Sequence, residues 1–227
     1  MPFNDNQNYI VARTIEQAWC DAMWCCIRNG YDYRITHGSY VGQIRRQLDH
    51  IVIRITEPWT RPLAPRLPEG SGIPPTTSDE KIERYFMEYI VSDEKEESED
   101  YTYGQYISRQ LPKVIQIINK SFGNSNQATI TIGEPNSINL ENPPCLRVID
   151  FKRVNDKLNM SVFFRSWDLY AGLPENLGGL QMLKEYLLIN LDFPLKDGEL
   201  ICYSSGLHIY EQYFPIVNQL CVDKIRI

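Results

Sequence analysis

The sequence lacks a basic excess, a long apolar run and the start of a secretory signal. Its formal net charge is −6 over 227 residues, which argues against a broad nucleic-acid surface because phosphate backbones attract a surplus of Lys and Arg. No apolar stretch approaches the roughly 20 residues that span a bilayer, which argues against a membrane partner. The first residues contain neither a basic segment nor an apolar one, so we expect a cytoplasmic protein.

Cysteine motifs for metal binding are absent as well. The six cysteines form no CxxC pair and no Cys/His cluster with zinc spacing, so we expect no metal and, for five of the six, reduced structural thiols. Internal repeats are missing too. A hydrophobic content of 43% and a charged content of 23% are ordinary for a soluble globular protein, and the length suffices for one sizeable core or two small ones.

One segment differs in composition from the rest of the chain. Six prolines lie within residues 58–75, and six of the eight residues 93–100 are acidic. The prolines predict a loop over the surface, and the acidic run predicts a solvated loop, with a partner-binding segment as the alternative. A helix is predicted between them, with Thr77 and Glu80 as its cap. We therefore expect a single domain over the whole chain, residues 1–227, with a variable insert at about 58–102.

Helical and strand patterns alternate irregularly along the remaining sequence. Thr14 and Gln17 have capping-box spacing, and Gly30 is a plausible end for the helix that they start. Gly178 and Gly179 predict that another stretch of backbone approaches a later helix closely. The other predicted elements are helices at 104–120, at 176–190 and from about 209, and strands at 50–56, 127–133, 145–151, 158–164 and 199–205. This mixture has no regular βαβ repeat, so the predicted fold class is α+β.

Four short segments of the C-terminal half contain chemically useful residues. Two prolines precede Cys145 and would hold it stiffly at the start of a strand. Residues 165–168 combine an arginine, a hydroxyl and a carboxylate, and Asn176 stands at the start of a predicted helix. His208 and Tyr210 are two residues apart on an extended segment, so they share one side of it. Taken singly, a cysteine, histidine or asparagine of this kind is more often structural than functional.

The order and spacing of these segments resemble the thymidylate synthase family. The most specific part is the run RSWDLYAGLPEN at 165–176, and the resemblance covers roughly residues 103–220. The short length and the unusual N-terminal half are most similar to a compact, archaeal-type branch. The resemblance implies a mixed or antiparallel sheet packed by helices, with one sheet face buried in a homodimer.

This resemblance implies an enzyme that converts dUMP to dTMP. The thiolate of Cys145 would add to carbon-6 of the uracil, which makes carbon-5 nucleophilic toward a methylene group on a reduced pterin. The co-substrate would be methylene-tetrahydrofolate or methylene-tetrahydromethanopterin. Two alternatives stay open. One is a pyrimidine nucleotide hydroxymethylase of the same fold, in which water instead of hydride ends the reaction; the other is a non-catalytic nucleotide-binding protein.

The same resemblance assigns roles to individual side chains. Arg165 would favour the thiolate and bind the phosphate, with Ser166 adding a hydroxyl donor. Asn176 would rotate its amide to match the uracil carbonyl and N–H together. Tyr103 would assist proton removal through water. The remaining substrate contacts are Asp168 and, at the sugar hydroxyl, His208 and Tyr210.

The sequence departs from the family pattern at the phosphate site. Two consecutive arginines usually reach the phosphate from the partner subunit, but Asn126 and Gln127 stand at the matching place. Two neutral amides cannot supply two charge-assisted hydrogen bonds. We expect compensation from Arg147, which has the same strand parity as Cys145, or from Arg34.

Two further positions differ from the family. Leu146 follows the nucleophile where a histidine is usual. The glutamate on the co-substrate side has no aligned counterpart, and both Glu83 and Glu88 in the helix of the insert are candidates for it.

Overall fold

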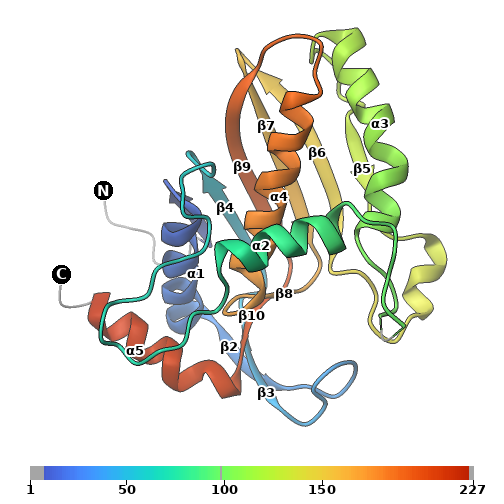
Figure 1. The fold of residues 1–227 in the computed structure, drawn as a ribbon. Helices are drawn as coiled ribbons and strands as arrows, with labels where there is room; N and C mark the ends of the chain where they lie inside the picture. The colour runs from blue at the N-terminus through green and yellow to red at the C-terminus, as the bar shows by residue number, and fades with distance from the viewer. Residues whose placement is uncertain (1–7, 98, 225–227) are drawn as a thin grey trace.

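The computed structural model describes residues 8–97 and 99–224, and two sheets organise this part of the chain (Figure 1). The larger sheet contains, in spatial order, β1 (Tyr9–Ala12), β4 (Ile51–Ile55), β9 (Lys196–Ser204), β7 (Lys157–Phe164), β6 (Leu146–Val154) and β5 (Thr129–Thr131). The smaller sheet contains β2 (Tyr31–Arg34), β3 (Ile44–Gln47), β10 (Leu207–Tyr210) and β8 (Trp167–Asp168). Both sheets mix parallel and antiparallel pairs, which confirms the predicted α+β class.

Helices cover one face of the larger sheet. They are α1 (Ile15–Asn29), α2 (Asp79–Tyr85) with a π-helical continuation (Phe86–Ile90), α3 (Gly104–Ser121) and α4 (Gly172–Ile189). A further helix, α5 (Phe214–Lys224), packs against α1. In Figure 1, α4 lies over the centre of the sheet, with α1 and α3 on its two sides and α2 crossing below it. No helix among residues 8–97 and 99–224 is long and apolar enough to cross a membrane.

The burial pattern of the strands follows from this one-sided covering. On β9, Leu200 and Cys202 are buried under the helices, while Ile201 is half-buried and Tyr203 is exposed on the opposite face. The adjacent strands β4 and β7 alternate in the same way, as the side chains of a strand point to opposite faces in turn. The hydrophobic core therefore lies between the helices and the sheet.

The ends of two helices differ from those predicted. Thr14 caps α1 as expected, because its hydroxyl accepts from the backbone N–H of Gln17 at 3.1 Å. The predicted cap of α2 is wrong: Ser78 is the cap, and the hydroxyl of Thr77 instead donates to Glu175 at 3.0 Å. The last helix begins at Phe214, because the residues near 209 belong to β10 and a 3₁₀ turn, Glu211–Tyr213.

The helix α4 also begins earlier than predicted, at Gly172. Pro174 falls within its first turn, where a missing backbone N–H removes no intrahelical bond. Asn176 therefore lies one turn inside the helix and not at its start.

Gly178 and Gly179 do allow a close approach to α4, but by side chains and not by backbone. A Cβ at Gly178 would lie 2.7 Å from Ile82, and one at Gly179 would lie 2.7 Å from the ring of Tyr85. Both partners come from α2, so the insert is packed directly onto the central helix.

Candidate active site

Cys145 lies immediately before β6, half-buried at the edge of the core. Its carbonyl accepts from the backbone N–H of Arg165 at 2.9 Å, which ties the cysteine to the end of β7. Burial raises the pKa of the Cys145 thiol, and the guanidinium groups of Arg165, Arg45 and Arg147 oppose that increase, in decreasing order. Three arginine side chains therefore act electrostatically on one thiol.

Arg165 holds the segment that precedes the cysteine. Its Nε donates to the carbonyl of Pro144 at 3.1 Å and its Nη2 to the carbonyl of Pro143 at 2.5 Å. The structure thus brings Arg165 and Cys145 together, as the sequence predicted. Two of the five guanidinium N–H groups are used in this way, and three remain for another acceptor.

Asn176 is fixed by a hydrogen bond on each side of its amide. The indole Nε1 of Trp167 donates to its Oδ1 at 3.0 Å, and its Nδ2 donates to the hydroxyl of Tyr85 at 2.8 Å. An indole N–H can only donate, so the amide has one possible orientation. The expectation that this amide rotates freely is therefore wrong. One N–H and one lone pair remain for a ligand.

A cluster of tyrosines lies between α2 and the cysteine. Tyr89 stacks on Tyr85 at 5.4 Å between ring centroids and meets Tyr103 edge-on at 5.1 Å, and Tyr101 lies 5.8 Å from Tyr103. The hydroxyl of Tyr103 accepts from the backbone N–H of Leu146 at 3.2 Å. Burial raises the pKa of Tyr103 well above its ordinary value and that of Tyr101 to about 12. Both hydroxyls therefore stay protonated at neutral pH.

His208 is buried on β10, and one of its two ring nitrogens forms a hydrogen bond within the chain. Its Nδ1 lies 2.9 Å from the carbonyl of Gly206, which can only accept, so the proton is on Nδ1. Nε2 is then an acceptor, and it is buried without a partner among the described residues. Burial lowers the pKa of His208 to about 3, so the ring is neutral. The ring of Tyr210 meets it edge-on at 4.9 Å.

Asp168 and Ser166 lie on the short segment between β7 and α4. The carboxylate of Asp168 accepts from the backbone N–H of Tyr170 at 3.1 Å and of Ala171 at 3.5 Å. Burial raises the pKa of Asp168 to about 6, because these bonds offset only part of the desolvation. Ser166 is half-buried beside Arg165.

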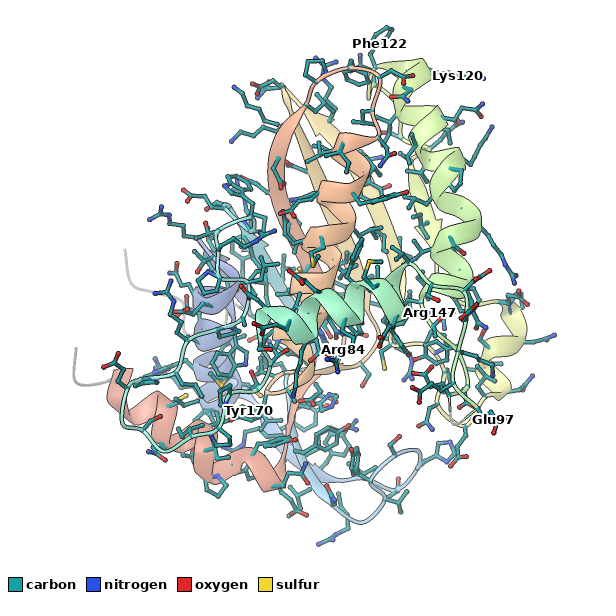
Figure 2. The ribbon with its side chains drawn as sticks, in the orientation of Figure 1. Arg84, Glu97, Lys120, Phe122, Arg147 and Tyr170 are labelled. Atoms are coloured by element: carbon teal, nitrogen blue, oxygen red, sulfur yellow. The ribbon has the colours of Figure 1, made fainter. Side chains whose placement is uncertain are left out.

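The two arginines proposed for compensation lie in different surroundings. Arg34 is exposed at the end of β2 and donates to the carbonyl of Gly42 in its own hairpin. Arg147 is half-buried next to Gly133 and is one of the three arginines that act electrostatically on Cys145 (below α3 in Figure 2). The pairing of β6 shifts between Leu146 and Val148, so the simple parity argument for Arg147 does not hold.

Asn126 and Gln127 lie far from the cysteine of their own chain. Both are exposed, and the next residue, Ala128, hydrogen-bonds Phe151 in the middle of β6. Six residues of strand separate Phe151 from Cys145, which is about 20 Å at 3.3 Å per residue. These two amides therefore do not contact the Cys145 of their own chain.

A cavity of about 610 Å³ adjoins the tyrosine cluster. It is lined by the stacked rings of Tyr85 and Tyr89, by Arg84 on α2 (Figure 2) and by Glu88, whereas Glu83 is not part of its lining. In residues 8–97 and 99–224, no group of three or more His, Cys, Asp or Glu side chains is arranged to hold a metal ion.

Sequence reasoning missed four residues at this site. Tyr85 and Tyr89 are four apart, the spacing of neighbours on a helix surface, and that spacing was a usable signal. Tyr101 is two residues before Tyr103, which gives both the same side of an extended chain. Arg45 gave no signal, because its strand has no apolar alternation and is located only by its pairing with Tyr210.

Comparisons with known proteins identify similar sequences over most of the chain. The family profile described as "Thymidylate synthase" matches residues 80–225, more than half of the chain. A protein of Methanosarcina barkeri is 27% identical over 215 residues, or 92% of each chain, and one of Methanococcoides burtonii is 29% identical over 221 residues, or 93% of each. A third, from Methanopyrus kandleri, is 25% identical over 210 residues, or 89% of this chain and 93% of its own. All three bear the name "Putative thymidylate synthase".

Proposed function

The chain belongs to the thymidylate synthase family, and from that premise we propose that it converts dUMP to dTMP, with Cys145 as the nucleophile and a methylene-tetrahydropterin as co-substrate. One observation supports this most strongly. The guanidinium groups of Arg165, Arg45 and Arg147 oppose the increase that burial causes in the pKa of the Cys145 thiol, and the same site contains an asparagine amide of fixed orientation. A reactive thiol and an oriented amide are what covalent catalysis on a pyrimidine ring requires.

The nucleophile is the thiolate of Cys145. Its sulfur forms a bond to carbon-6 of the uracil, and the electron pair of the carbon-5/carbon-6 double bond moves toward carbon-5 and the carbon-4 oxygen. Burial works against the thiolate, and Arg165, Arg45 and Arg147 work for it. Arg165 also keeps the cysteine in place through the carbonyls of the two preceding prolines.

Asn176 selects and orients the base. Its free N–H donates to the carbon-4 carbonyl of uracil, and its free lone pair on Oδ1 accepts from the ring N–H. Trp167 and Tyr85 hold the amide in the orientation that makes this pair available. Cytosine has an amino group and an unprotonated nitrogen at these positions, so the fixed amide favours uracil.

Two groups are positioned for the sugar and for proton transfer. Nε2 of His208 is an unpartnered acceptor next to Tyr210, which suits a sugar hydroxyl as donor. Tyr103 accepts from the N–H that follows Cys145, so its own proton is free to donate to an ordered water near carbon-5. Its raised pKa keeps that proton in place.

The cavity beside Tyr85 and Tyr89 fits the pterin co-substrate. A flat heterocycle can stack on aromatic rings, and the volume of about 610 Å³ lies in the range of small-molecule sites. When bound, the co-substrate supplies the one-carbon unit and the hydride that complete the methyl group. Of the two glutamates considered for the co-substrate side, Glu88 lines this cavity and Glu83 does not, so we propose Glu88.

The uncovered face of the larger sheet supports a homodimer. Phe163 and Tyr203 stack on this face at 5.3 Å, and Val11 next to it is 52% exposed. A second subunit on this face would bury these side chains. It is also the arrangement in which Asn126 and Gln127 can approach a partner's cysteine.

The reaction itself is the test of the proposed function. Purified protein is given dUMP labelled with tritium at carbon-5, first with methylene-tetrahydrofolate and then with a methanopterin analogue, and both tritium release and the nucleotide product are measured. Release with dTMP as product is expected, and dCMP in direct competition should be the poorer substrate. Hydroxymethylated product would identify the hydroxymethylase instead, and no release with either pterin would refute the proposal.

A further inference from the structure

Arg45 is a partly buried cation that has no carboxylate partner among the described residues. It lies on β3, directly opposite Tyr210 of β10. Its Nη2 donates to the hydroxyl of Tyr210 at 3.1 Å and its Nη1 to the hydroxyl of Tyr33 at 3.2 Å. Both partners are neutral, so the charge of Arg45 is not compensated by either of them.

The next residue on the strand provides the contrast. Arg46 points to the other face of β3 and forms a bidentate pair with Asp32, at 2.7 and 2.8 Å. Both guanidinium groups also lie over an aromatic ring, that of Arg46 over Phe214 at 5.2 Å and that of Arg45 over Tyr210 at 5.0 Å, so only the ion pair distinguishes them. Arg46 is thus a structural ion pair, whereas Arg45 retains unused donors. Of five N–H groups two are used, and the Nε is buried without a partner in the described part of the chain.

The groups around Arg45 belong to the candidate active site. It acts electrostatically on Cys145, Asp168, His208 and Tyr210. Asp168 is the carboxylate among them, but its Oδ1 is occupied by backbone N–H groups and it forms no ion pair of 4 Å or less with Arg45. His208 is neutral and adds no positive charge. The site therefore has a cation that an incoming anion could neutralise.

We propose that Arg45 binds the phosphate of the nucleotide substrate and so makes the enzyme prefer a nucleoside monophosphate to the free nucleoside. This inference rests on the proposed function. Two features support it. Two N–H groups of Arg165 already donate to the carbonyls of Pro143 and Pro144. Asn126 and Gln127 contribute no charge. Arg45 supplies from within the chain a cation that the family usually takes from the partner subunit.

Binding measurements on three variants test this role. We compare Arg45→Gln, Arg45→Lys and the control Arg46→Gln, and titrate each with dUMP and with deoxyuridine. Arg45→Gln should weaken dUMP binding by about 10- to 100-fold, the effect of losing one or two charge-assisted hydrogen bonds, and deoxyuridine binding by less than about 3-fold. Arg45→Lys should recover part of the loss, because lysine keeps the charge but not the planar fork. Arg46→Gln should leave the ratio of the two affinities unchanged.

A second probe separates this inference from the proposed function. Inorganic phosphate should raise the melting temperature of the wild type and of Arg46→Gln, and should have a much smaller effect on Arg45→Gln. That result supports Arg45 even if dUMP is not converted. If Arg45→Gln weakens the binding of dUMP and of deoxyuridine equally, Arg45 only positions Tyr210. If the preference for dUMP over deoxyuridine does not change, Arg45 does not bind the phosphate. Neither result would affect the proposed turnover of dUMP by the wild type.

Discussion

Two regions of the chain meet at the candidate active site: one contributes the reacting groups, and the other contributes aromatic rings and hydroxyl contacts. The motif region, residues 145–210, contains the thiol, the amide and the buried histidine. The segment predicted as an insert, residues 58–102, contributes tyrosine rings and single hydroxyl contacts, such as the hydroxyl of Tyr85, which accepts from Asn176 at 2.8 Å. The motif region is built on long paired strands, while the insert is a short helix between loops. The difference indicates that reacting atoms are held by the sheet, and that the insert orients them and shapes the co-substrate cavity.

Removing the nucleophile from the motif region should have the largest effect. Cys145→Ser is expected to lower dTMP formation by about 10⁴-fold or more, because a hydroxyl cannot form the required adduct at neutral pH. The change is nearly isosteric and the site is half-buried, so the melting temperature should change little. Cys25→Ser on α1 is the matched control, and it should keep full activity. Wild-type activity in Cys145→Ser would exclude Cys145 as nucleophile.

The second-largest effect is expected on the uncovered face of the larger sheet, where we propose the dimer contact. Tyr203→Lys puts a charge into the proposed dimer face, and burying an unpaired lysine should raise the dimer dissociation constant by at least about 100-fold. Light scattering at micromolar concentration should find a dimer for the wild type and a monomer, inactive in the tritium assay, for the variant. Tyr186→Lys changes a similarly exposed tyrosine on α4, on the helical side, and should remain a dimer. A fully active wild-type monomer would contradict the dimer.

The free energy of unfolding should depend on pH through buried groups of the motif region, first of all His208. His208 has a folded pKa of about 3, below its ordinary value near 6.5, so the unfolded chain takes up a proton first as the pH falls. Its contribution to stability is complete above pH 6.5 and is lost toward pH 3, at about 1.4 kcal/mol per unit. The free energy of unfolding is measured by urea titration at pH 6.5 and at pH 4.5. The decrease between these two pH values should be about 3 kcal/mol smaller in His208→Gln than in the wild type.

The contribution of Asp168 to stability changes in the opposite direction to that of His208 over nearly the same pH range. Its folded pKa of about 6 is raised, so the folded state takes up the proton first and gains stability as the pH falls from 6 to 4. Asp168→Asn should make the acid loss of the protein steeper. Equal slopes for both variants and the wild type would show that neither group is buried as described.

The smallest effect concerns the contact between the insert and α4. Gly178→Ala and Gly179→Ala each place a Cβ 2.7 Å from an α2 side chain, which should cost about 1–3 kcal/mol of stability, offset by up to about 1 kcal/mol of helix propensity. Only Gly179→Ala displaces Tyr85, the partner of Asn176, so only this variant should lower kcat/KM for dUMP, by about 10-fold. Equal kinetics in the two variants would show that the insert does not orient Asn176.

The motif region could be predicted largely from its residues. Strands such as residues 158–164 alternate clearly because one face is covered by helices and the other is not. The resemblance predicted that Arg165 lies near Cys145, and in the structure the two residues flank the paired ends of β7 and β6. The start of α4 was missed because Pro174 suggests a loop, although proline is compatible with the first turn of a helix.

The N-terminal hairpin could not be predicted. The strands Tyr31–Arg34 and Ile44–Gln47 are short, polar and half-exposed, so they show no hydrophobic alternation. The second strand pairs with β10, which lies more than 150 residues further along the chain, and the first pairs with the second. Arg45 reaches the site only through that long-range register, which local patterns do not contain.

The central claim is that Cys145 forms a covalent bond to the pyrimidine, and one measurement tests it most directly. The protein is incubated with 5-fluoro-dUMP and methylene-tetrahydrofolate, digested, and mapped by mass spectrometry. Carbon-5 of this nucleotide cannot release its fluorine, so the adduct accumulates. We predict the added mass on the peptide that contains Cys145 and on no other cysteine peptide. An adduct on Cys20, Cys25, Cys26, Cys202 or Cys221, or tritium release from dUMP by protein that never forms an adduct, would contradict the account.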